Sequence, residues 1–412
     1  MASLLFGTIV YLNWRAAKRR EREAWVKDVV DAALLSRRGS TSSSSTGSTW
    51  RVHSVLTALE LEFEAWLSMS VRGLFLTYAI PSVSSVLYKT GGFNKDIQRR
   101  YADMELLIRE FNENAVDGTV DFNGQPERAK QSLYRINAIH QQYKSLIKYD
   151  DMIYVWSVFA VTPALWMESR WSWRQLTKDE KCAIYHHWID IGKYLNLSVD
   201  KQFSSWDSIR EWKLAYEERN MRFCRSNVEV SGSTIDYFMD GVVRYPPLIG
   251  YFRPVIIQLM SCLQEDPRHA AALGLPKANP ILFVLVDLIL TTRALIFRWL
   301  LPPKPFSWQD RLTGTVGTPW KMDVTATPVL RNGSSGSNKG SKCPMGKILY
   351  WPARALDFSN KTYHPATIAS VKTEAPQEGH YSIEDMGPRH VEKGALCEKP
   401  IYIGHPNYTI EI

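Results

Sequence analysis

Helical periodicity is the strongest constraint that this sequence places on its fold. From residue 94 onward apolar residues recur at steps of three and four, and no stretch shows the apolar–polar alternation that strands require. The sequence therefore predicts an all-α chain, with a single large helical domain over residues 51–302. Within it we expect helices at 95–115, 127–147, 150–169, 176–197, 205–223, 251–264 and 280–301.

The segments outside this domain differ from it in composition. Residues 1–22 are a short apolar run followed by the basic block RAAKRRER, and residues 37–50 are a Ser-rich linker. The apolar run is shorter than the roughly 20 residues that span a bilayer, and it lacks the small residues of a signal-peptide cleavage site. We expect a short membrane anchor or an interfacial tether there. Residues 303–412, rich in Pro, Gly and Ser, are predicted to be an irregular C-terminal extension.

Charge and cysteine usage favour a cytosolic location for the main domain. Positive charge directly after an anchor retains the following chain on the cytosolic side. The five cysteines are far apart and show no zinc-ligand spacing, which is typical of a reducing compartment. The net charge of +8 comes without a nucleic-acid-binding module, so we interpret it as membrane-side charge. We predict a membrane surface and no nucleic acid as partner, and no pattern predicts the oligomeric state.

Two of the expected helices are apolar on all sides, which is typical of a core helix or a membrane contact. Acidic residues at both ends of 150–169 favour burial inside the protein. The 280–301 helix is long enough to span a bilayer but carries Asp287 and Arg293, and charges are costly in lipid. For this helix we favour a buried or interfacial position.

One histidine lies where an aliphatic residue would be expected. His140, in INAIHQQY, falls on the apolar face of the 127–147 helix. A histidine in this position is either a core residue whose ring nitrogens are satisfied by neighbours, or a ligand that points into a pocket. Both interpretations stay open from the residues alone. The other members of this face are Ala129, Leu133, Ile136, Tyr143 and Ile147.

An arginine occupies a comparable place on the preceding helix. Arg100 begins an apolar face that continues through Met104, Leu107 and Phe111. A buried arginine needs an acceptor, such as a propionate or a carboxylate. Alternatively, its side chain extends to solvent or pairs with an acidic residue of its own helix. One imidazole and one cation beside an apolar pocket are what a haem requires.

Signals of other enzyme classes are absent from the sequence. There is no G-x-S-x-G, P-loop, G-x-G-x-x-G or H-E-x-x-H motif. His186 and His187 are adjacent, and neighbouring residues on a helix point in different directions, so they do not easily share a metal. We expect these two histidines at a surface or an interface.

Several segments, in this order, resemble one known family: RRYADMELLIREF, INAIHQQY and DDMIYVWSVFAVTPALWMES with the residues that follow. They are similar to the endoplasmic-reticulum-bound oxygenases typified by MpaB, which share a catalytic domain with bacterial rubber oxygenase. The resemblance runs from about residue 54 to 302, and a short piece returns at 379–394. It implies a helical fold of the rubber-oxygenase type that binds one haem b.

The resemblance also implies roles for four residues. His140 matches the axial iron ligand, and Arg100 matches an arginine near the haem. Arg135 matches a residue that contacts a propionate or a neighbouring helix. The family has a threonine four residues after the first arginine, where this chain has Met104. A thioether cannot donate a hydrogen bond, so this departure bears directly on activity.

The implied reaction is oxidative cleavage of a carbon–carbon double bond in an isoprenoid or prenylated secondary metabolite by dioxygen. The implied location is the cytosolic face of the endoplasmic reticulum membrane. We expect the aromatic-rich helices at 150–173 and 280–301 to form the substrate entrance, so Trp-to-Ser changes there would weaken liposome binding. Two alternatives remain open: a haem-free lipid- or terpenoid-binding protein, and a non-catalytic member of the same fold.

Overall fold

The computed structural model describes most of the predicted helical region and parts of its flanks. The described residues are 2–39, 55–56, 59, 73, 75–113, 116, 128–169, 174–242, 249–264, 266–296, 299, 383, 387 and 395–397. The linker after residue 39 and most of the extension after residue 302 lie outside them.

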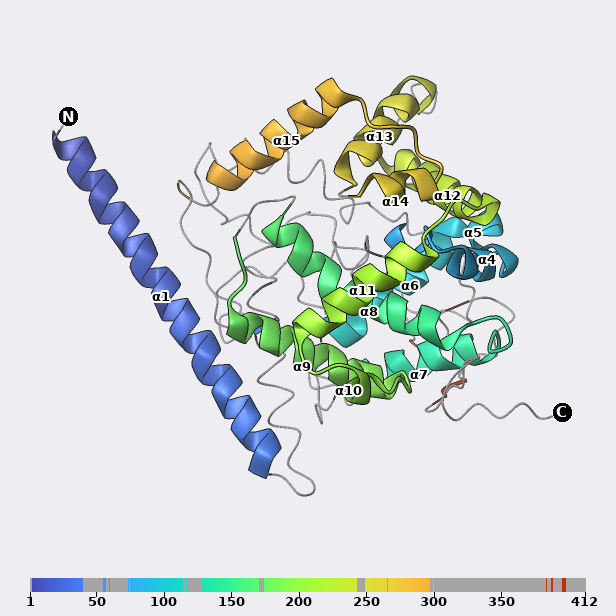
Figure 1. Cartoon of the computed structure of the whole chain (residues 1–412), viewed down its shortest axis with the longest axis horizontal. Helices are drawn as coiled ribbons and strands as arrows, with labels where there is room; N and C mark the ends of the chain where they lie inside the picture. The colour runs from blue at the N-terminus through green and yellow to red at the C-terminus, as the bar shows by residue number, and fades with distance from the viewer. Residues whose placement is uncertain are drawn as a thin grey trace, which may run out of the picture.

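The described residues form helices and no β-strand, so the all-α prediction is confirmed. The helices are α1 (Ala2–Gly39), α4 (Pro81–Lys89), α5 (Gly92–Lys95), α6 (Ile97–Glu113), α7 (Arg128–Gln141), α8 (Tyr149–Glu168), α9 (Lys178–Tyr194), α10 (Val199–Gln202), α11 (Trp206–Asn220), α12 (Arg225–Val242), α13 (Ile249–Leu263), α14 (Pro267–Ala272) and α15 (Pro280–Leu295). Figure 1 shows them gathered into one body, with α1 along one side.

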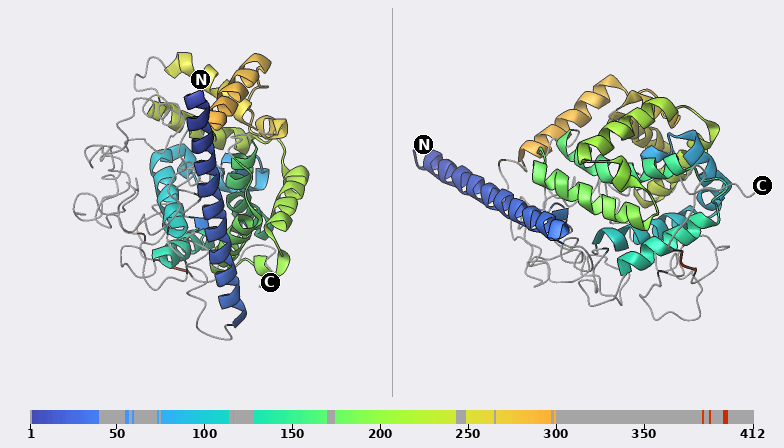
Figure 2. Two further views of the ribbon diagram at one scale, coloured as in Figure 1. Left: turned by 90° about the vertical axis from the view of Figure 1, so that its left-hand side faces the viewer. Right: turned by 60° about the horizontal axis from the view of Figure 1, so that its bottom comes forward.

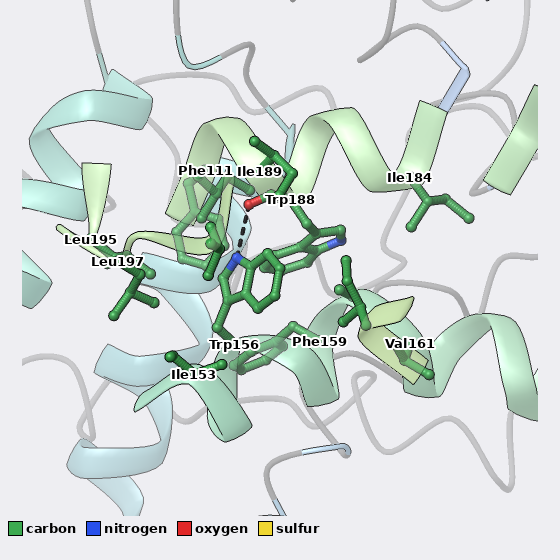
Figure 3. Close-up of a cluster of buried hydrophobic side chains, with 14 of the residues drawn as sticks. Phe111, Ile153, Trp156, Phe159, Val161, Ile184, Trp188, Ile189, Leu195 and Leu197 are labelled. Carbon is green, nitrogen blue, oxygen red and sulfur yellow. Dashed lines mark hydrogen bonds between the residues drawn. The ribbon is translucent and has the colours of Figure 1, made fainter. Parts of the chain in front are cut away.

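Helix α8 is the centre of this body. It runs through Pro163 without interruption, and most of its residues are buried. The Trp156 indole donates a hydrogen bond to the Trp188 carbonyl of α9 at 2.8 Å, and Phe159 stacks on the Trp188 ring with centroids 5.7 Å apart (Figure 3). Burial of α8 is confirmed. Trp156 is only 2% exposed and therefore cannot form part of the substrate entrance predicted for residues 150–173. Residues 170–173 lie outside the described part of the chain, so an entrance there stays a prediction.

Helix α12 was not expected from the sequence. Its residues include three serines and two glycines, which lower helix propensity. Tertiary contacts compensate: Val230 and Met239 are buried in a cluster with Tyr78 and Phe93. A buried hydrogen bond of 2.6 Å also joins Asn227 to Ser84 of α4.

Helix α1 is held to the body by its second half. Val26, Val30 and Ala33 pack with Ala183 of α9, and Arg22 lies 3.1 Å from Glu180. Glu180 also completes the capping box with Thr177 that starts α9. The first half projects from the body and exposes apolar side chains (Figure 2). No helix in the described part of the chain has the length and hydropathy of a membrane-spanning segment.

Helices α13 and α15 pack together but leave an apolar outer surface. Cys262 of α13 is buried with Val286 and Leu290 of α15. The opposite side of α15 is exposed, with Ile281 at 82% and Leu288 at 60%. Full burial of residues 280–301 is therefore wrong for α15, and its interfacial position stays a prediction.

Three short parts of the C-terminal region pack on α6 and α7. The Gly387 amide donates to Asp103 of α6 at 3.0 Å, and Arg135 of α7 donates to the Ala395 carbonyl at 3.0 Å. Ile383 is buried against Leu107 and Ile139. These residues belong to the segment predicted as an irregular extension, and here they pack against α6 and α7.

The close approach of α9 to α8 and α10 at Gly192 suggests a test of the core packing. A Cβ at Gly192 of α9 would collide with Val199 Cγ2 and lie 3.2 Å from Trp156 Nε1, whereas a Cβ at Gly232 of α12 would meet nothing within 4 Å. We expect Gly192→Ala to lower the free energy of unfolding by about 1–3 kcal/mol through overpacking. We expect Gly232→Ala to raise it by up to ~1 kcal/mol through helix propensity.

Denaturant titration of both variants followed by circular dichroism measures this difference. Equal midpoints for the two variants would contradict the close crossing of α8 and α9.

Candidate functional site

An apolar cavity lies between α4, α6, α7 and α8. Aliphatic and aromatic side chains form most of its wall, with Trp156, Phe159 and Trp188 at its inner end next to the core cluster of Figure 3. A few polar side chains interrupt this wall: Thr77, Tyr78, Thr90, Arg100, His140, Tyr143 and Asp151. A cavity of this kind suits an apolar ligand that is oriented by a few polar contacts.

His140 reaches this cavity from the last turn of α7. The face predicted from Ala129, Leu133 and Ile136 is the buried face of the helix, as expected. Burial, and then the charge of Arg100, lower the pKa of His140 to about 4. The imidazole is therefore neutral at pH 7, which is the form that can offer a nitrogen lone pair to a metal.

Arg100 of α6 lines the same cavity. Burial lowers the pKa of its guanidinium, and Asp103 and Tyr78 act against this shift. The ion pair with Asp103 is made by Arg99, whose Nε lies 3.5 Å from Asp103 Oδ2. The Nε of Arg100 is buried and has no hydrogen-bond partner among the residues that the structure describes. The cavity thus holds a cationic side chain with one N–H group that the described residues leave without an acceptor.

Met104 also lines the cavity, one helical turn after Arg100. It packs against the main core cluster, and Leu107 and Phe111 extend the same wall. The face predicted for residues 96–111 is therefore the cavity face. At the position where the resemblance implies a threonine, this cavity has an apolar thioether.

Arg135 is placed differently from the other predicted site residues. It is 1% exposed and is not among the residues that line the cavity. Its guanidinium donates to the Ala395 carbonyl and lies next to Gly387, where a Cβ would be 4.0 Å from Arg135 Nη2. It joins α7 to the C-terminal region behind His140.

The two adjacent histidines of α9 do not form a metal site in the described structure. His187 is only 1% exposed and meets the Trp188 ring edge-on, so of the two predicted positions, a surface or an interface, the surface is wrong for this residue. The reason is that α9 is covered on more than one side, by α8 and by α1. His186 lies against the Tyr185 ring. Across the described residues, no group of three His, Cys, Asp or Glu side chains is placed to hold a metal ion.

Sequence reasoning missed Asp151 as a site residue. We took the acidic pair at the start of α8 only as a helix end, but Asp150 is exposed and Asp151 is 4% exposed and lines the cavity. The sequence did contain a signal for this residue. Adjacent residues on a helix point in different directions, so on a helix that is apolar on all sides two consecutive acidic residues cannot both reach solvent, and one of them must be buried.

Comparison with known proteins fits this arrangement. A family model described as "ER-bound oxygenase mpaB/B'/Rubber oxygenase, catalytic domain" matches residues 61–302. The chain is 28% identical over 261 residues to ER-bound oxygenase mpaB' of Penicillium brevicompactum. The aligned region covers 60% of this chain and 58% of that relative. It is 29% identical over 214 residues to ER-bound oxygenase mpaB of Penicillium roqueforti (strain FM164), covering 48% and 67%.

A further relative, ER-bound oxygenase mpaB of Penicillium brevicompactum, is 32% identical over 177 residues, covering 39% of this chain and 43% of that protein. The chain therefore spans between about two fifths and two thirds of the length of these relatives. The family model covers more than half of the chain and includes all the cavity helices. The chain belongs to the family of MpaB-type ER-bound oxygenases and rubber oxygenases.

Proposed function

We propose that this protein is a membrane-associated, haem-dependent oxygenase that cleaves a carbon–carbon double bond of an isoprenoid or prenylated substrate. One observation carries the proposal: a neutral histidine and an arginine with a buried Nε line the same apolar cavity. Membership of the family supports the reaction class.

The residues of the cavity fit a haem. His140 would hold the iron, because its neutral imidazole is available at pH 7. Arg100 would bind a propionate, which offers the acceptor that its buried Nε lacks among the described residues. Arg135 is the weaker candidate for this role, because its guanidinium already bonds the Ala395 carbonyl. When bound, a haem supplies the redox chemistry that activates dioxygen.

The chain itself would bind, orient and shield the substrate. The aliphatic and aromatic wall excludes water and holds the alkene by apolar contact. Met104 adds to this apolar wall and cannot donate a hydrogen bond to an oxygen ligand. In the overall reaction one double bond and one dioxygen become two carbonyl groups, so both oxygen atoms remain in the products.

The exposed surface of α13 and α15 supports a membrane as partner. Phe252 and Val255 of α13 are about half exposed, as are several apolar residues of α15. The first turns of α1, with Ile9 and Val10 exposed, lie at the same end of the molecule (Figures 1 and 2). Basic residues follow directly on α1, as at the headgroup level of an anionic cytosolic leaflet. We assign this partner as the endoplasmic reticulum membrane, since the relatives are named ER-bound.

This surface is also connected to the cavity wall. The inner side of α13 packs through Ile256 and Ile257 on the cluster that contains Tyr78 and Phe93. Tyr78 and Phe93 in turn line the cavity. A substrate dissolved in the bilayer would thus first contact α13 and α15, and α13 packs directly on residues that line the cavity.

Two alternatives use the same cavity. In a haem-free lipid- or terpenoid-binding protein, the apolar wall would act without iron. In a non-catalytic member of the family, the replacement of the threonine by Met104 would account for the loss of oxygenase activity. The spectrum of the purified protein separates both from the oxygenase.

The first prediction concerns the axial ligand. We expect the detergent-purified protein, expressed with added haemin, to show a Soret band that shifts on reduction with dithionite. We expect His140→Ala to lose most of this band, because His140 is the imidazole that lines the cavity. His186→Ala is the control, since His186 lies on α9 against Tyr185, and should retain the band. A colourless wild-type protein would leave the fold intact and contradict the haem.

The second prediction separates Arg100 from its neighbour. We expect Arg100→Leu to weaken haemin affinity about 10- to 100-fold, the worth of one charged hydrogen bond of about 1.5–3 kcal/mol. The same change should stabilise the haem-free protein, because it removes a buried charge. Arg99→Leu should leave haemin affinity nearly unchanged, since Arg99 pairs with Asp103 instead. Haemin titration and thermal melting measure the two effects, and equal loss of affinity in both variants would contradict the assignment.

The third prediction tests the membrane surface. We expect Val284→Ser/Leu288→Ser to weaken flotation with phosphatidylcholine/phosphatidylserine vesicles about tenfold, because two exposed apolar side chains of α15 leave the lipid. Leu214→Ser on α11 removes an apolar side chain that is 44% exposed elsewhere and should have no effect. Haem content should be the same in all three proteins. Unchanged flotation of the double variant would show that α15 does not contact the membrane.

A further inference from the structure

Asp151 is the one acidic side chain among the residues that line the cavity. It lies in the first turn of α8 and is 4% exposed. Its Oδ1 accepts two hydrogen bonds, from the Tyr216 hydroxyl at 2.5 Å and from the Ser82 hydroxyl at 2.9 Å. Its Oδ2 is buried and has no hydrogen-bond partner within the described part of the chain. The two oxygens of one carboxyl group thus have different environments.

A structural role accounts for Oδ1 only. Through Tyr216 and Ser82 it joins α8 to α11 and α4, and a serine or an asparagine could make similar contacts. The second oxygen contributes nothing to this link. A buried acceptor left without a partner costs about 1–3 kcal/mol. Asp151 therefore keeps a buried acceptor that destabilises the fold, on a residue that lines the cavity.

The surroundings of Asp151 limit what can meet Oδ2. The cavity wall contributed by the same two helices is apolar, with Val155 one turn along α8 and Val83 and Val86 on α4. Arg100, on α6, has its own electrostatic partners in Asp103 and Tyr78. Burial raises the pKa of Asp151, while the Tyr216 and Ser82 hydrogen bonds and the charge of Lys148 act against this rise. Lys148 is exposed, and the cavity wall that α4 and α8 contribute beside this carboxyl group is otherwise apolar.

We propose that Asp151 binds a hydroxyl group of the substrate through Oδ2. The inference rests on the proposed function, because it takes the cavity as the substrate site, and it narrows the substrate class. The substrate is an isoprenoid-type molecule with a hydroxyl at one end, and the apolar wall binds its chain. A pure hydrocarbon or an ether would leave Oδ2 without a donor.

A pair of matched ligands tests this assignment. Farnesol and farnesyl methyl ether have the same apolar chain, and only farnesol can donate a hydrogen bond. Their dissociation constants can be measured with the full-length, detergent-purified protein by quenching of tryptophan fluorescence, because Trp156 and Trp188 line the cavity. We expect wild type to bind farnesol at least about fivefold more tightly than the ether, which corresponds to the lower end of the cost of an unpaired acceptor.

Asp151→Asn should abolish this preference. Its amide oxygen can keep the hydrogen bonds from Tyr216 and Ser82, which directs the amide NH2 toward the cavity. An NH2 donates equally well to an alcohol or an ether oxygen, so the two ligands should then bind within about twofold of each other. Asp150→Asn, an exposed neighbour on the same helix, is the matched control and should keep the wild-type preference.

Three outcomes would overturn the inference: equal affinities in wild type, an unchanged preference in Asp151→Asn, and a preference lost equally in Asp150→Asn. The wild-type comparison stands even where the Asp151 variant fails to fold. The Soret band of the same samples separates the two proposals. Equal affinities with a Soret band present would remove the role of Asp151 and leave the haem oxygenase in place. Binding of neither ligand would remove the terpenoid site and the role of Asp151 together.

Discussion

The burial of polar groups against one apolar cavity is the constraint on which the site depends. His140, Arg100 and Asp151 come from three helices and lose most of their water there. Desolvation is the leading cause of the pKa shift at all three residues. A folded protein retains such groups where a ligand or a neighbouring group compensates for the lost water. The cavity is therefore less stable empty than filled, and its ligands contribute to the stability of the fold.

The rigid part of the fold supports these groups from behind. Helix α8 carries Asp151 at its start and Trp156 and Phe159 further along, and these two rings are fixed against α9. Gly192 allows the close approach of α9, since any side chain there would meet Val199. The Trp156 and Trp188 rings belong both to the core cluster and to the cavity wall. A change in core packing at this crossing would therefore also change the shape of the site.

Periodicity predicted the inward faces of the cavity helices from the sequence. The steps of three and four that include His140 and Arg100 place both residues on the cavity side, because each helix has one covered face. Periodicity failed where burial is not one-sided. His187 was assigned to a surface or an interface, but it is buried because several helices cover α9. Helix α12 was missed because its contacts outweigh its propensity. The partition of Asp150 and Asp151 between solvent and cavity depends on the position of α4 and α11, which local sequence does not encode.

The contacts of the C-terminal region have a consequence for the order of folding. The bonds from Arg135 to Ala395 and from Gly387 to Asp103 join residues 260 and 284 positions apart. Contacts of such high sequence separation require closure of a very long loop, and they form late. Helices α6 and α7 leave the ribosome long before this region does, so they must first pack without it. A chaperone or a protease would encounter that intermediate with Leu107 and Ile139, two residues that also line the cavity, lacking their contact with Ile383.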